Sequence, residues 1–163
     1  MKKVKGIMTK AVISCSPETT IREVAGLMKT HNCGFIPITD ENKKLTGVVT
    51  DRDICLIMSE RASGLQDLEI EHIMQIDLHT CTPNDNLGKA LDIIRTGKIS
   101  RLPVVNDEFK LEGIISISDI LFHQLMNRWD EDLYGINAET ILGTIGAISE
   151  SRLVRETLEN KLF

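Results

Sequence analysis

Apolar and polar positions along the chain follow one pattern that occurs twice. In each copy, apolar residues at helical spacing predict a helix, and two short apolar stretches joined by a polar turn predict a β-hairpin. A further helix follows the hairpin, and a short extended piece ending in a proline comes before the first helix. The predicted order in each copy is β-α-β-β-α, which indicates an α+β fold.

Local signals mark the ends of these elements. Thr20 stands three residues before Glu23, which predicts a capping box, and in the second copy either Asp85 or Asn86 serves as the helix cap. A proline inside each first hairpin strand indicates an edge strand or a position at the start of a strand. The hairpin strands are expected over 35–38, 45–50, 102–105 and 111–116, and the closing helices over 53–60 and 119–127.

The two copies align without a gap at a spacing of 66 residues, so that Asp53 matches Asp119. A unit of about 50 residues buries too little surface to be stable alone. We therefore expect two repeats that pack together about a pseudo-twofold axis. The expected domains are a first repeat over 1–62, a linker over 63–70, a second repeat over 71–127 and a C-terminal helical extension over 128–163.

The extension carries two apolar stripes at helical spacing, which predict one or two amphipathic helices. Two roles fit this pattern equally well. The extension either packs on the two repeats as a tail, or serves as a dimerisation or partner helix. The stripes are formed by Ile141, Leu142, Ile145 and Ile148, and by Leu153, Val154, Leu158 and Leu162.

Composition narrows the classes of function. The chain has 163 residues, a net charge of −5 and a pI near 5.4. This acidic balance, without a nucleic-acid-binding motif, argues against a nucleic-acid partner. No apolar run approaches the ~18 residues of a membrane span, and no long apolar core follows the basic N-terminus as in a secretory signal. We expect a cytoplasmic protein with no membrane partner.

The cysteines and histidines suggest no chemistry of their own. None of the four cysteines forms a C-x-x-C pair, and we interpret all four as buried small hydrophobic residues rather than metal ligands. The histidines match no catalytic signature, and the chain has no P-loop. We therefore expect no metal site, no catalytic residue, no cofactor and no enzyme activity. The cysteines are Cys15, Cys33, Cys55 and Cys81.

The passage from the second hairpin strand into the closing helix carries the candidate chemistry. It runs from Gly47 to Ile54 in the first copy and from Gly113 to Ile120 in the second. A helix N-terminus offers free N–H groups and a positive dipole end, which suit a phosphate. The aspartate in each passage can accept bonds from both hydroxyls of a ribose, because a cis diol presents two donors to one carboxylate.

The same spacing also fits a purely structural role. Thr50 with Asp53, and Ser116 with Asp119, match the capping-box pattern, and spacing alone favours that role. Two further features favour a ligand. The glycine in each passage lets another group approach the strand closely, and one arginine stands near each aspartate. The arginines are Arg52 and Arg101.

With these motifs, the chain resembles a tandem pair of CBS (cystathionine-β-synthase) domains of the stand-alone bacterial or archaeal type. The resemblance rests on a Gly-h-h-Thr/Ser-x-x-Asp-h pattern (h, apolar) that occurs twice, each time after an h-Pro-h-h strand, and on Ile-Met entries at 7–8 and 73–74. It covers about residues 4–127. It implies a non-catalytic sensor that binds an adenosine-type nucleotide between its repeats, a homodimer and an unidentified effector protein.

The family resemblance also implies a set of ligand contacts. Such pairs bind AMP, ADP or ATP, which we expect here, and some bind S-adenosylmethionine or NADH. Two alternatives stay open: a sensor for S-adenosylmethionine or NADH, and a ligand-free structural oligomerisation module. By resemblance, Asp53 and Asp119 hold ribose, and the phosphate-facing residues are Thr50, Arg52, Ser116, Ser118 and Arg101. The adenine of the Asp119 site is lined by Lys10, Val12, Cys33 and Gly34, and that of the Asp53 site by Ile76, Leu78, Ile99 and Ser100.

The two implied sites are not equivalent. The second copy has Ser118 where the first has Arg52, and the first has Phe35 where the second has Arg101. Asp51 also adds negative charge beside Arg52, which disfavours a triphosphate there. We therefore expect the site of the second copy to bind the ligand better.

Overall fold

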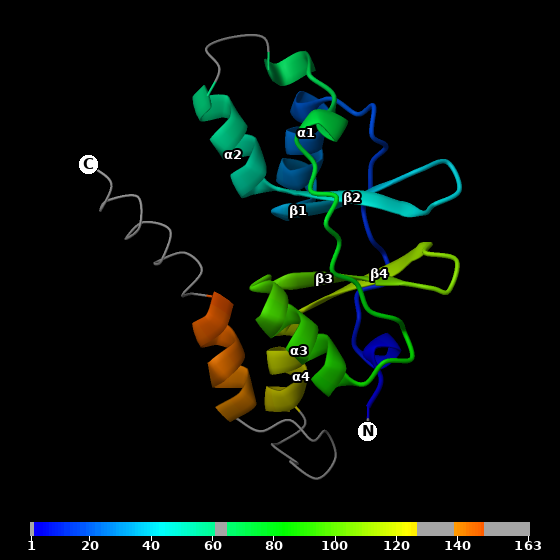
Figure 1. Cartoon of the computed structure of the whole chain (residues 1–163), viewed down its shortest axis with the longest axis vertical. Helices are drawn as coiled ribbons and strands as arrows, with labels where there is room; N and C mark the ends of the chain where they lie inside the picture. Colours follow the sequence, from blue (N-terminus) through cyan, green and yellow to red (C-terminus); the bar gives the residue numbers. More distant parts are fainter. Residues whose placement is uncertain (1, 61–64, 127–138, 149–163) are drawn as a thin grey trace, which may run out of the picture. The chain divides into compact units, whose positions relative to one another are not determined.

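The computed structural model describes residues 2–60, 65–126 and 139–148 (Figure 1). Each repeat contains two α-helices and a two-stranded antiparallel hairpin, β1 with β2 and β3 with β4. Residues 139–148 add a further helical segment. The elements are η1 (Val4–Gly6), α1 (Ile21–His31), β1 (Phe35–Thr39), β2 (Leu45–Thr50), α2 (Asp51–Glu60), η2 (Leu65–Asp67), η3 (Ile70–His72), α3 (Leu87–Gly97), β3 (Arg101–Val105), β4 (Leu111–Ser116) and α4 (Ile117–Met126), where η is a 3-10 helix.

This order confirms the predicted α+β fold, with one difference in the extended pieces. In place of a strand, the first piece makes an isolated parallel bridge between Cys15 and Ile38, and Cys81 pairs with Val104 in the same way. The next rungs on the two sides of the first bridge need an N–H from Pro17 and from Pro37, which prolines lack. The prolines thus limit the pairing to a single bridge.

Side-chain caps form as the sequence predicts, and the structure decides the open choice. Thr20 and Glu23 form a full capping box at the start of α1. Asn86 is the cap of α3, with its side chain accepting a bond from the Lys89 N–H. Asp85 instead accepts bonds from the Thr82 N–H and the Lys89 ammonium.

The chain forms two compact units that do not follow chain order. The first-repeat unit contains Ala11–Leu78 and Val105–Glu112, and the second-repeat unit contains Met1–Lys10, His79–Val104 and the chain from Gly113 onward. The segment before each repeat therefore joins the unit of the other repeat. The exact domain boundaries at 62, 70 and 127 stay a prediction.

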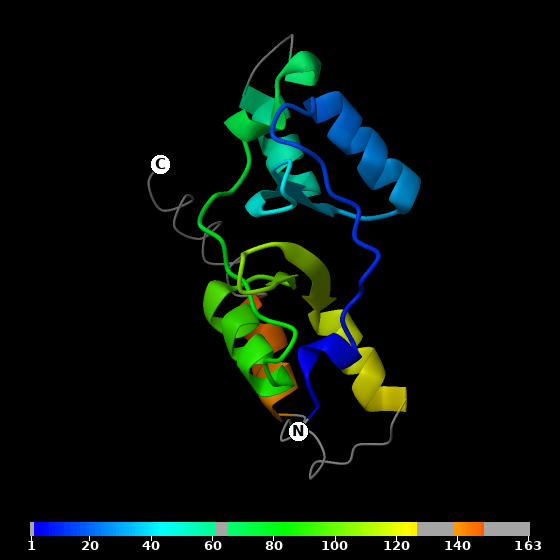
Figure 2. The same ribbon diagram turned by 90° about the vertical axis from the view of Figure 1, so that its right-hand side faces the viewer.

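Each unit has its own buried core. In the first-repeat unit, α1 and α2 lie on the same side of the β1–β2 hairpin (Figure 1), and Ile70 from the segment between the repeats joins them. In the second-repeat unit, the η1 segment lies beside α4 (Figure 2), and its Val4 is fully buried. The second core is formed by Val4, Cys81, Leu87, Ala90, Leu91, Ile94, Leu102, Val104, Ile115, Ile120 and Ile141.

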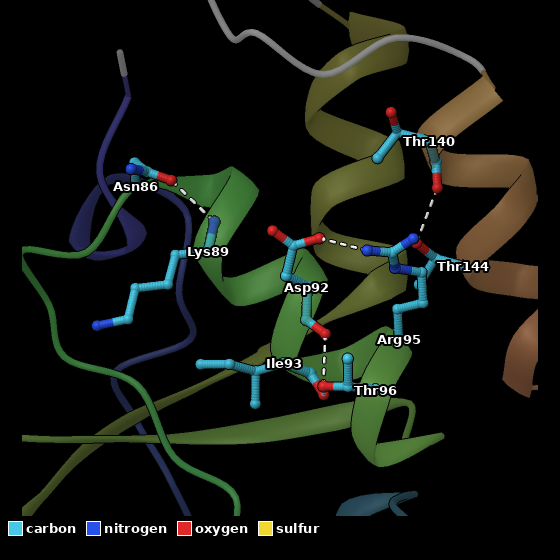
Figure 3. A network of polar contacts seen from close by, with 8 residues as sticks. All are labelled: Asn86, Lys89, Asp92, Ile93, Arg95, Thr96, Thr140 and Thr144. Carbon is cyan, nitrogen blue, oxygen red and sulfur yellow. Dashed lines mark hydrogen bonds and ion pairs between the residues drawn. The ribbon is translucent and has the colours of Figure 1, made fainter.

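The helical segment 139–148 packs beside α3 in the second-repeat unit (Figure 3). Ile141 is 2% exposed and Thr144 is fully buried, with its hydroxyl donating to the Thr140 carbonyl. Leu142, which the sequence pattern placed in the same apolar stripe, is 68% exposed. The inward face is therefore narrower than predicted, and the choice between a tail and a dimerisation or partner helix stays open. The predicted stripe at 153–162 lies outside the described residues.

The four cysteines differ in burial. Cys81 is buried, Cys15 and Cys33 are half-buried, and Cys55 on α2 is exposed. The prediction that all four are buried was therefore wrong for Cys55, because it lies on the outer face of its helix. No helix among the described residues has the length and apolar character needed to span a membrane.

Thiol labelling tests these environments. Burial raises the pKa of the Cys81 thiol to about 12, with the Asp85 carboxylate adding to the effect. Because only the thiolate reacts, we expect iodoacetamide at pH 8 to modify Cys55 well before Cys81 in the native protein. Peptide mass spectrometry over a time course measures both rates. In urea, where the chain is unfolded, the two cysteines should react at similar rates, and this measurement is the reference. Equal rates for Cys55 and Cys81 in the native protein would contradict the described burial.

Unfolding measurements test whether the segment before the second repeat belongs to the first core. Ile70 is fully buried, whereas Ile76, six residues later, is 73% exposed. Ile70→Ala should lower the free energy of unfolding by about 2–4 kcal/mol, because it leaves a cavity. The matched control Ile76→Ala should change it by less than about 0.5 kcal/mol. Urea unfolding followed by circular dichroism gives both values, and similar losses would show the assignment to be wrong.

Candidate functional site

Each candidate site begins where a strand turns directly into a helix, a place we call the corner. In the first repeat β2 ends at Thr50 and α2 begins at Asp51; in the second, β4 ends at Ser116 and α4 begins at Ile117. The helices begin two residues earlier than the sequence predicted, because the last residue of each strand is itself the helix cap.

Both corners contain the capping arrangement raised as the structural alternative. At the second corner, the Ser116 N–H and hydroxyl donate to Oδ2 of Asp119 at 2.8 and 2.6 Å, and the Asp119 N–H donates to the Ser116 hydroxyl oxygen at 3.1 Å. The first corner repeats these bonds between Thr50 and Asp53. The hydroxyl protons therefore point at the carboxylates, and phosphate contacts by Thr50 and Ser116 stay a prediction.

The cap leaves part of each carboxylate available. A carboxylate has about four acceptor positions, two on each oxygen, and the cap fills the two on Oδ2. Oδ1 of Asp119 accepts no hydrogen bond from the described part of the chain, so two positions stay open. Oδ1 of Asp53 accepts a bond of 3.1 Å from Nε2 of Gln75, which leaves one.

Gln75 is a residue whose role sequence reasoning missed. It lies in residues 73–75, which with the matched residues 7–9 we call the entry segments of the two repeats, and its backbone pairs with Val48 of β2 through two bonds of 2.8 and 3.0 Å. The matched residue in the other unit, Thr9, pairs with Ile114 of β4 in the same way. The sequence offered one signal for this role, because Gln75 stands where the other copy has Thr9. That contrast does not reveal the contact with Asp53, since the two residues are 22 positions apart in the chain.

The two corner glycines are explained by these entry segments. A Cβ at Gly47 would lie 2.5 Å from Sδ of Met74, and one at Gly113 would lie 2.8 Å from the Thr9 carbonyl oxygen. The close approach inferred from the sequence is therefore made by the protein itself. The glycines do not add independent support for a ligand.

The two corners also differ in their basic residues. Arg101, at the start of β3, is exposed and forms no ion pair with another described residue, and the same holds for Arg52. At the position of Arg101, the first repeat has Phe35, which is 8% exposed and lies at the start of β1. Exposed cations without a partner are suited to an anion.

The remaining predicted contacts divide between the two units. The assembly of residues from both units into complete sites stays a prediction. Within a unit, the Asp51 N–H donates to the Gly34 carbonyl, and the Ile117 N–H donates to the Ser100 carbonyl, both at 3.2 Å. The first-repeat unit holds Thr50, Arg52, Asp53, Val12, Cys33, Gly34, Ile76 and Leu78, and the second-repeat unit holds Ser116, Ser118, Asp119, Arg101, Lys10, Ile99 and Ser100.

One titratable group lies a turn along α4 from Asp119. Burial and the neighbouring Lys2 ammonium lower the pKa of His123. Its imidazole is therefore neutral at pH 7, and Nε2 lies 2.7 Å from Nζ of Lys2. This contact joins the N-terminal segment to α4.

Comparison with known proteins decides the family. The CBS domain family matches the chain twice, over residues 4–60 and 70–125, and the two matches include both corners. The chain belongs to the CBS domain family. Its two repeats are CBS domains, and the Asp53 and Asp119 corners occupy the same place in each.

Individual relatives show the contexts in which such a pair occurs. The CBS domain-containing protein YhcV of Bacillus subtilis (strain 168) is 37% identical over 128 residues, covering 78% of this chain and 89% of YhcV. Inosine-5′-monophosphate dehydrogenase of Methanocaldococcus jannaschii is 31% identical over 121 residues, covering 74% of this chain but 23% of that enzyme. Because this chain spans under a quarter of the dehydrogenase, the catalytic activity of the enzyme does not carry over.

A solved relative contains ligands. The CBS domain pair of protein MJ0100 has been determined in complex with 5′-methylthioadenosine and S-adenosyl-L-methionine. It matches this chain with a TM-score of 0.71 and 27% identity, covering 78% of this chain and 99% of that one. Both of its ligands contain adenosine.

The stability of the corner can be tested without a ligand. Ser116→Ala removes the acceptor for the Asp119 N–H and should lower the free energy of unfolding by about 1 kcal/mol. The control is Ser118→Ala, which makes the same change two residues later at an exposed position without a hydrogen bond in the described structure. We expect the control to stay within about 0.5 kcal/mol of wild type in urea unfolding. Equal effects would contradict the cap.

Proposed function

We propose that this CBS pair is a non-catalytic regulatory module that binds an adenosine nucleotide (AMP, ADP or ATP), with residues of both repeats contributing. The Asp119 corner is the main ribose site. The observation that carries the proposal is Oδ1 of Asp119, which accepts no hydrogen bond from the described residues and so keeps two acceptor positions beside a helix N-terminus in a CBS repeat. The binding of adenosine compounds by the MJ0100 pair supports it.

The chemistry of a ribose fits this carboxylate. The 2′ and 3′ hydroxyls of a nucleoside present two adjacent donors, and one carboxylate oxygen offers two acceptor positions. Bonds to an ionised acceptor are shorter and stronger than bonds between neutral groups. Because the cap holds Oδ2 in place, Oδ1 needs no rearrangement to accept the diol.

Charge supports a phosphate on the ligand. Arg101 is exposed in the same unit as Asp119, and Lys10 at the end of the N-terminal segment is exposed too. The N-terminus of α4 adds the positive end of its helix dipole. AMP carries a 5′-phosphate where 5′-methylthioadenosine carries a methylthio group, and the two share the 2′,3′-diol and the adenine.

A second candidate ligand is S-adenosylmethionine, which the MJ0100 pair binds. It shares the diol and the adenine but has a sulfonium in place of the phosphate. The sulfonium gives Arg101 no anionic partner at the place of the phosphate, and the carboxylate at the end of the methionine part is the one anion that this ligand offers. NADH and a ligand-free structural module complete the alternatives.

The proposal includes how binding acts on other molecules. A ligand shifts a protein between two arrangements only through a difference in its affinity for them. We propose that binding by a cytoplasmic homodimer changes its contact with an effector protein. No catalytic step and no cofactor are part of this function.

Binding measurements on matched variants test the proposal. In thermal-shift assays and calorimetry, AMP at 100 times its Kd should stabilise the wild type by about 2.7 kcal/mol. Asp119→Asn keeps one oxygen for the cap and replaces the other acceptor by an NH₂ donor. This variant should stay folded and lose most of the AMP-induced gain. Unchanged AMP binding by Asp119→Asn would remove the proposed ribose site.

The Arg101→Gln variant separates the nucleotide from the other adenosine ligands. Loss of a charge-assisted bond to phosphate should weaken AMP by about tenfold, while 5′-methylthioadenosine should bind as before. S-adenosylmethionine, NADH, ADP and ATP complete the ligand set. Equal weakening of AMP and 5′-methylthioadenosine would show that Arg101 does not recognise phosphate, and a wild type that binds none of these compounds would favour the structural module.

A further inference from the structure

The entry segment of the second repeat forms a side-chain hydrogen bond to the Asp53 carboxylate, whereas that of the first repeat forms none to Asp119 among the described residues. Gln75 donates its side-chain amide to Oδ1 of Asp53 at 3.1 Å, while two backbone bonds to Val48 hold the Gln75 backbone beside β2. Thr9 has the same two backbone bonds to Ile114, and its side chain makes no hydrogen bond to another described residue. The backbone geometry is therefore shared, and the side chain makes the difference.

The Gln75 bond changes the number of acceptor positions that each aspartate has left for a ligand. The cap uses two of the four positions on each carboxylate. Asp119 keeps two, which is the number a cis diol needs. Asp53 keeps one while the Gln75 amide is bound, so a ribose must first displace that amide.

We infer that Gln75 is an internal competitor that weakens nucleotide binding at the Asp53 corner and so makes the pair bind preferentially at Asp119. The inference rests on the proposed function, because it concerns the ribose role of the same carboxylates. Gln75 is exposed. When a ligand displaces its side-chain amide from Oδ1 of Asp53, the amide can therefore form a hydrogen bond with water instead. The cost of displacing a single hydrogen bond corresponds to about a two- to tenfold weaker Kd.

The test isolates one corner at a time by calorimetry with AMP on the full chain. In an Asp119→Asn background, only the Asp53 corner binds, and Gln75→Thr should tighten its Kd by about two- to tenfold. Threonine is the residue that the protein itself uses at the matched position. In an Asp53→Asn background, the reciprocal change Thr9→Gln should weaken the Asp119 corner by a similar factor.

The side-chain amide of Gln75 gives a readout that needs no ligand. Its ¹H–¹⁵N NMR signals should shift in Asp53→Asn and stay in place in Asp119→Asn. Unmoved signals in Asp53→Asn would overturn the inference. So would a Gln75→Thr variant that binds AMP as weakly as its background or more weakly, since Gln75 would then not compete with the ligand. If none of the variants nor the wild type binds an adenosine compound, the proposed function fails, and the competition fails with it.

Discussion

Two backbone bridges each join the entry segment of one repeat to the last hairpin strand of the other, and each bridge lies within one compact unit. Thr9 pairs with Ile114, and Gln75 pairs with Val48. A Cβ beside each bridge would run into the entry segment, into the Met74 side chain at Gly47 and into the Thr9 carbonyl oxygen at Gly113, which accounts for the two glycines. Further backbone bonds accompany the burial of Val4 in the second core and of Ile70 in the first: the Val4 N–H donates to the Asp85 carbonyl and the Ile70 N–H to the Thr19 carbonyl. Neither core is completed by its own repeat alone, because a unit of about 50 residues buries too little apolar surface.

The corner carboxylates have a structural use in the folded chain, and the proposed function gives Asp119 a second one. Asp119 closes a capping box with one oxygen and presents the other without a partner among the described residues. The structural and the ligand-binding interpretations of the motif are therefore compatible. A cap that fixes the carboxylate lowers the cost of ordering it on binding, because that order already exists before the ligand arrives.

Sequence differences between the repeats then separate two corners with the same backbone geometry. Phe35 is buried where Arg101 is exposed, and Gln75 reaches an aspartate where Thr9 does not. Under the proposed function, both differences favour an anionic nucleotide at Asp119 over Asp53. The two repeats provide two corners with the same backbone, and single side chains at matched positions make the corners different.

The sequence by itself determined the elements and the family. Strands 45–50 and 111–116 agree with the structure at both ends, and the Thr20–Glu23 cap forms as predicted. These features depend on residues a few positions apart, which a pattern of spacing encodes directly. The twofold motif also identified both corner aspartates.

Tertiary structure alone decided which segment completes which core, which side of 139–148 faces inward, and that Gln75 contacts Asp53. It also placed Cys55 on the surface and left Leu142 exposed. The reason is physical: these outcomes depend on contacts between residues far apart in the chain. Periodicity reports only that a face is apolar, and the partner that covers the face is set by the folded chain.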